Sequence, residues 1–122
     1  MSVGRGREAE DAALRYLLGQ GLSLVARNHR CRAGEIDLVM TDGPVLVFVE
    51  VRARSRTRFG TPEESIGARK QARVAAAARH FLATHPDQAH RAMRFDVVAI
   101  SGGGKDNGMR WIRAAFDAPG AG

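Results

Sequence analysis

The 122-residue sequence contains a single cysteine, Cys31. One cysteine excludes an intramolecular disulfide and a cysteine-rich zinc cage, and it fits a reducing compartment. His29 and Cys31 could supply two zinc ligands, but no second pair follows at the spacing of a zinc site. We therefore expect Cys31 to be an ordinary core or surface thiol.

Long apolar runs are also missing. The longest covers residues 45–49, whereas a membrane-spanning helix needs about 20 apolar residues, and the start of the chain lacks the apolar core of a signal peptide. We expect a cytoplasmic protein without membrane contact. With 44% hydrophobic and 26% charged residues, the composition is that of an ordinary globular chain. We predict one domain over residues 1–117 and a short tail over 118–122.

Acidic residues and lysines are scarce relative to arginine. The chain has 13 acidic and 19 basic residues, only two of them lysines, for a net charge of +6. Such a balance favours phosphate-rich partners, although a soluble basic surface explains it equally well. Glycine-rich phosphate-binding motifs are absent, and we interpret residues 102–104 as a loop. The sequence leaves the oligomeric state open between a monomer and a homodimer.

The spacing of apolar residues predicts an α/β fold. Helical spacing covers residues 8–18 and, after the capping sequence Thr61-Pro62-Glu63-Glu64, a second helix that runs to about Thr84. Strand patterns cover residues 24–28, 34–40, 45–51 and 94–100, and residues 111–116 close the domain. The order is αβββαβ, with a mixed sheet flanked by helices. The fourth strand follows a helix and should run parallel to the third.

Charged residues gather on one face of the second and third strands. If residues 41–44 form the connecting loop, Met40 pairs with Val45 and Asp37 becomes a diagonal neighbour of Glu50, about 7 Å away between backbones. Two carboxylates at that separation can bind one hard divalent cation. The alternative is a set of solvated charges paired with arginines. Glu35 and Arg52 on the same face of a valine-rich unit favour the cation.

Several motifs together are characteristic of a known family. They are GREAEDAA at residues 6–13, GEIDLV at 34–39, FVEVRAR at 48–54, RFDVV at 94–98 and AAF at 114–116. From about residue 4 to 116 the chain resembles the YraN family of bacterial endonuclease-like proteins. In its presumed site that family is similar to Holliday-junction resolvases and other PD-(D/E)xK nucleases. The resemblance implies a restriction-endonuclease-like fold and metal-dependent hydrolysis of DNA, with branched DNA as an analogy.

The resemblance also implies roles for individual residues. Asp37, Glu50 and the outer acidic residue Glu10 would bind Mg²⁺ or Mn²⁺, and Val51 would offer its backbone carbonyl to the metal. Asp37, Glu50 and Arg52 would be the catalytic residues. Alternatively, Glu10 is an ordinary glutamate near a helix N-terminus, where its charge interacts with the helix dipole. Glu35 would either support the ligands or form a salt bridge.

One departure from the nuclease motif concerns its lysine, which is Arg52 here. Arginine can stabilise charge on a phosphate but cannot act as a base. This favours slow or undetectable cleavage, and it makes a nucleic-acid-binding module with little or no activity the alternative function. A basic protein-interaction domain explains the charge but not the carboxylates.

Lys70 stands in the apolar row of the second helix and has two interpretations. It could replace the motif lysine from the helix, or it could extend its charge away from the core, which we favour. The predicted phosphate-binding residues are Arg27, Arg30, Arg52, Arg54, Arg56, Arg58 and Lys70.

Overall fold

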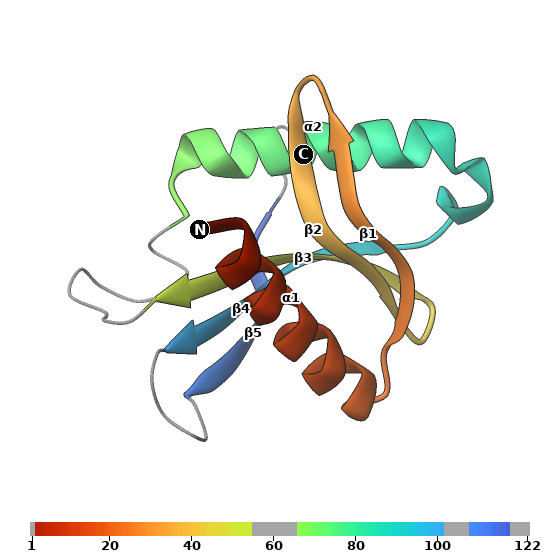
Figure 1. The fold of residues 1–122 in the computed structure, drawn as a ribbon. Helices are drawn as coiled ribbons and strands as arrows, with labels where there is room; N and C mark the ends of the chain where they lie inside the picture. Colours follow the sequence, from red (N-terminus) through yellow and green to blue (C-terminus); the bar gives the residue numbers. More distant parts are fainter. Residues whose placement is uncertain (1, 55–65, 102–107, 118–122) are drawn as a thin grey trace.

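The computed structural model describes residues 2–54, 66–101 and 108–117 (Figure 1). Its elements are α1 (Ser2–Gly19), β1 (Ser23–Cys31), β2 (Gly34–Asp42), β3 (Val45–Arg54), α2 (Ala68–Thr84), the short 3₁₀ helix η2 (Pro86–Gln88), β4 (Met93–Ser101) and β5 (Met109–Phe116). The predicted α/β order is confirmed, and residues 109–116 add a fifth strand. No helix among the described residues is long and apolar enough to cross a membrane.

The five strands form one mixed sheet in the order β1-β2-β3-β4-β5. The parallel pairing predicted between the third and fourth strands is confirmed for β3 and β4, and the other neighbours are antiparallel. The central strand β3 is buried on both faces from Leu46 to Glu50, as its unbroken apolar sequence predicted. Glu50 is therefore a charged residue inside the most buried strand.

A helix covers each face of the sheet, and two apolar clusters result. On one face, residues of α2 such as Val74 and Phe81 pack against Phe48 and Phe95. On the other face, Ala13 and Leu17 of α1 pack with sheet residues that include Val47 and Val49. Neighbouring residues of β3 thus belong to opposite clusters, as the alternation of a strand requires.

Both helices begin at different residues from those predicted. α1 begins at Ser2, six residues before the predicted start. α2 begins at Ala68, and its N-cap Gly67 has an extended backbone with φ −74° and ψ 174°, so the prediction of a helix continuous from Thr61 is wrong at this point. The predicted capping sequence at residues 61–64 lies outside the described residues. The end of α2 at Thr84 is confirmed.

The turn between β2 and β3 is shorter than predicted. Asp42 pairs with Val45 and Met40 pairs with Val47, so the loop has two residues and the predicted pairing of Met40 with Val45 is wrong. Gly43 has a φ of +61°, a conformation that glycine adopts readily and that tight hairpin turns require. The error is two residues, and an even shift keeps the faces of the paired residues matched because strands alternate with period two. Before the paired region the alternation of β2 is broken, since Ile36 and Leu38 pack in opposite clusters.

Candidate functional site

Asp37 and Glu50 lie where β2 and β3 separate. The paired residues end at Leu38 and Val49, and the two carboxylates occupy the next position on each strand. Asp37 Oδ2 accepts a hydrogen bond of 2.8 Å from the backbone N–H of Val51. This bond holds the Asp37 side chain against β3, beside Glu50.

Burial makes a negative charge on either carboxylate unfavourable. Glu50 is only 2% exposed, and its burial together with the charge of Asp37 raises its pKa to about 8. Burial also raises the pKa of Asp37 to about 6, although the N–H of Val51 opposes the shift. Glu50 Oε2 is buried and has no hydrogen-bond partner within the described part of the chain. The site therefore favours a positive charge beside these oxygens.

Lys70 supplies one such charge from α2. Its Nζ lies 3.3 Å from Glu50 Oε1, and its side chain is 39% exposed. The favoured interpretation, in which Lys70 carries its charge away from the core, is therefore wrong. Lys70 precedes Val74 by one helical turn and so lies on the inner face of α2. The ammonium ends at the boundary between the carboxylates and solvent.

Glu10 approaches the site from α1. It lines a cavity of about 380 Å³ together with Asp37 and Val51, and its charge contributes to the raised pKa of Asp37. Glu10 stands well beyond the first turn of α1, so the helix-dipole explanation is wrong. Its Oε1 lies 3.3 Å from Arg27 Nη2, which also lies 2.8 Å from an oxygen of Asp11. The guanidinium of Arg27, predicted to bind phosphate, is thus engaged with α1.

The remaining predicted basic residues are spread over several segments. Arg52 is partly buried on β3, two residues after Glu50, and Arg54 ends that strand. Arg56 and Arg58 lie outside the described residues, so their role stays a prediction. Arg30 forms an exposed salt bridge of 3.2 Å with Glu35, which confirms the salt-bridge interpretation of Glu35.

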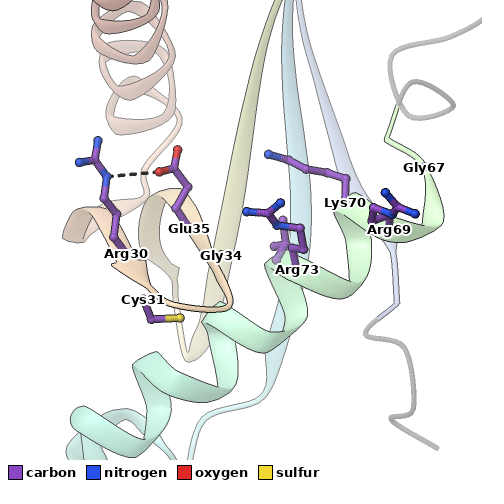
Figure 2. Close-up of a pocket in the computed structure, with 9 residues that line it drawn as sticks. Arg30, Cys31, Gly34, Glu35, Gly67, Arg69, Lys70 and Arg73 are labelled. Carbon is purple, nitrogen blue, oxygen red and sulfur yellow. Dashed lines mark ion pairs between the residues drawn. The ribbon is translucent and has the colours of Figure 1, made fainter.

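A basic cleft adjoins the carboxylates between the β1–β2 hairpin and α2 (Figure 2). Its volume is about 710 Å³, and it is lined by Arg30, Cys31, Gly34, Glu35, Gly67, Arg69, Lys70, Arg73 and Val74. Arg69 and Arg73 were not among the predicted phosphate-binding residues. Their four-residue spacing beside Lys70 is the sequence signal that could have identified them.

The residues around Asp37 fit a hard divalent cation that retains several water ligands. Mg²⁺ in proteins often uses only one or two carboxylates and completes its shell with water and phosphate oxygens. Glu50 Oε2 has no partner among the described residues, and both carboxyl groups have a raised pKa. A cation bound between Asp37 and Glu50 would provide the missing partner and lower both pKa values. In the described ranges no three His, Cys, Asp or Glu side chains group closely enough to hold a metal by themselves, and the part of Glu10 in the metal site stays a prediction.

Comparison with known proteins identifies the family. Residues 9–100 match the model of "Uncharacterised protein family UPF0102". A UPF0102 protein of Ralstonia nicotianae is 54% identical over 94% of this chain and 88% of its own length. One from Stutzerimonas stutzeri is 48% identical over 96% and 98%, and one from Nitrosomonas europaea is 49% identical over 93% of each chain. Because the family model and the near full-length relatives agree, this chain belongs to the UPF0102 family.

Proposed function

We propose that this protein is a divalent-metal-dependent endonuclease that hydrolyses phosphodiester bonds in DNA. The observation that carries the proposal is the Lys70 ammonium 3.3 Å from the buried Glu50 carboxylate, beside Asp37. Two carboxylates and a lysine are the groups that the nuclease resemblance requires, and the strand position of that lysine holds Arg52 instead. Lys70 supplies the missing ammonium from α2.

Each side chain has a role that its position supports. Asp37 and Glu50 would hold Mg²⁺ or Mn²⁺, with the backbone carbonyl of Val51 as a further ligand. When bound, that cation would supply Lewis acidity toward the phosphate and the attacking water. Lys70 is an ammonium and can both stabilise the phosphate and transfer a proton, whereas Arg52 can only provide charge. Lys70 thus removes the main chemical objection to turnover.

The alternative function is a DNA-binding module without activity. The ion pair between Lys70 and Glu50 favours it, because a lysine bound to one carboxylate partly replaces the cation that catalysis needs. A module of this kind would bind DNA with a steep dependence on salt. It would not cleave DNA with any divalent cation.

The two functions separate in a cleavage assay. Purified protein is incubated with single-stranded, duplex and branched DNA in Mg²⁺, in Mn²⁺ and in EDTA. We expect metal-dependent cleavage that Asp37→Asn and Lys70→Met abolish, while Arg79→Gln, an exposed substitution on the same helix, leaves the rate unchanged. Lys70→Arg should keep DNA binding but lose most of the rate, because arginine retains charge without a transferable proton.

A measurement without turnover tests the cation site. Mg²⁺ or Mn²⁺ should raise the melting temperature of the native protein at pH 8, because a ligand that binds only the folded state stabilises it. The same increase should be absent in Asp37→Asn. Bound DNA with no cleavage in either metal would support the binding module. Cleavage that survives Asp37→Asn would overturn the proposed site.

A further inference from the structure

The basic cleft has two walls that come from distant parts of the chain. One is the tip of the β1–β2 hairpin, with Arg30 and Glu35, and the other is the first half of α2, with Arg69, Lys70 and Arg73. Figure 2 shows Arg30 and Glu35 on the hairpin and the α2 side chains on the other side of the cleft, with Lys70 extending toward the hairpin. Lys70 lines the cleft, and its Nζ also lies 3.3 Å from Glu50 Oε1. Lys70 therefore connects the cleft with the carboxylate site.

The two walls are in direct backbone contact at Gly34. A Cβ built on Gly34 would lie 2.6 Å from the carbonyl oxygen of Arg73, so the hairpin backbone packs directly on the backbone of α2. Figure 1 shows the hairpin crossing this helix. A ligand that binds here meets a preformed surface and loses little affinity to reorganisation of the protein.

The charge of the cleft selects an anionic ligand. Among the described residues that line it are four basic side chains and one acidic side chain. Arg69 and Arg73 are exposed, and neither forms an ion pair with another residue that the structure describes. Glu35, the one acidic group among these described residues, pairs with Arg30 at an exposed position, where such pairs contribute little. A phosphate can therefore replace Glu35 as the partner of Arg30.

The spacing of the charges favours a chain of phosphates over a single anion. Arg69 and Arg73 are one helical turn apart, about 5–6 Å between their Cβ atoms, and Arg30 adds a charge on the opposite wall. The backbone N–H groups at the start of α2 lie at the same end as Lys70. The N-cap Gly67 offers them no side-chain bond, and such N–H groups attract phosphate.

We infer that this cleft binds the sugar-phosphate backbone of one nucleic-acid strand and leads that strand past Arg73 to Lys70 and Glu50, with Arg69 as a further contact at the start of α2. The inference rests on the proposed function only for the cleavage of the bound strand at the carboxylate site. It places the main phosphate contacts on α2 and the hairpin, in addition to the arginines that follow Glu50 in the sequence. The phosphates of one strand can meet the charges on both walls, so a single-stranded segment should suffice for binding.

The test measures binding without cleavage. Fluorescence anisotropy with a labelled 20-nucleotide single strand, and with its duplex, is recorded in EDTA for the native protein and for the double variant Arg69→Glu/Arg73→Glu. We expect the double variant to lose more than tenfold in affinity for the single strand. The milder Arg69→Gln/Arg73→Gln should lower the salt slope by about 1.4, since each phosphate contact with a single strand contributes about 0.7.

Matched controls separate the cleft from general charge. The double variant Arg79→Glu/Arg110→Glu, with one substitution on α2 and one on β5, changes the same total charge at exposed positions that do not line the cleft, and it should bind within about twofold of the native protein. Circular dichroism and melting curves verify folding of every variant. Equal losses in the cleft variants and the controls would overturn the inference. A duplex that binds through the cleft while the single strand does not would overturn its one-strand form.

The experiments distinguish failure of the cleft inference from failure of the proposed endonuclease function. If the cleft variants lose binding but the native protein never cleaves DNA, the cleft stands and the endonuclease falls. If the native protein cleaves DNA and the cleft variants retain both the affinity and the KM, the endonuclease stands and the cleft falls.

Discussion

Replacing Glu50 by glutamine should stabilise the fold at alkaline pH, although it removes a residue of the proposed site. Glu50 is buried in β3, and burial together with the charge of Asp37 raises its pKa from 4.5 to about 8. The substitution keeps the shape of the side chain and removes the charge. Buried carboxylates that serve only structure are normally satisfied by hydrogen bonds, so a gain in stability on neutralising Glu50 would indicate a site maintained for function.

The direction of this change in stability follows from proton linkage. The folded state binds the Glu50 proton more tightly than the unfolded state does, so this contribution to stability is fully present below pH 4.5 and is lost as the pH rises to about 8. Each pKa unit corresponds to about 1.36 kcal/mol, which gives a cost of about 4 kcal/mol near pH 8. Glutamine avoids this cost but loses the half-exposed contact with Lys70.

We therefore expect a net gain on the order of 2 kcal/mol at pH 8 and almost none at pH 5. For a chain of 122 residues this corresponds to a rise in melting temperature of about 8 °C. Scanning calorimetry in EDTA at both pH values measures it. Glu35→Gln, at an exposed carboxylate of the neighbouring strand, is the control and should change stability by less than about 0.5 kcal/mol. A Glu50→Gln variant that is no more stable than the native protein at pH 8 would refute the reasoning.

Two further substitutions test the parts of the fold that hold the site. Asp96 is fully buried and accepts hydrogen bonds from Arg94 at 2.9 Å, Trp111 at 2.9 Å and the Ala114 N–H at 3.0 Å. Asp96→Asn should cost about 3–5 kcal/mol in urea unfolding because it leaves the Arg94 charge without its main partner; a loss below about 1 kcal/mol would contradict this. Gly34→Ala should cost about 1–3 kcal/mol and weaken single-strand binding, because its methyl group would displace the hairpin from α2. Unchanged stability and affinity would show that the hairpin contact does not hold the cleft.

The contrast between Asp96 and Glu50 shows the limit of local patterns. Both are acidic residues within apolar strand sequences, and both are almost completely buried. The partners of Asp96 come partly from β5, whereas Glu50 has one oxygen without a partner among the described residues. Strand period and composition are the same in the two cases. Only the neighbours brought by the fold separate a structural carboxylate from a candidate ligand.

Alternation along the strands was sufficient to predict that Asp37 and Glu50 lie near each other where β2 and β3 separate. The predicted loop was two residues too long, but a shift of two residues preserves the alternation of the paired residues. The helix order and the parallel pairing of β3 with β4 also follow from the sequence, since a helix between two strands favours a parallel crossover. These properties depend on residues close together in the chain.

The tertiary structure decided where the positive charges lie. Lys70 contacts Glu50, 20 positions earlier, and Arg27 contacts Glu10 and Asp11 on α1. Helical period places Lys70 on the inner face but does not say which strand residue lies opposite, because that depends on how α2 packs across the sheet. Long charged side chains reach in several directions from one backbone position. Their partners are therefore chosen by the packing of distant segments, which local sequence patterns do not contain.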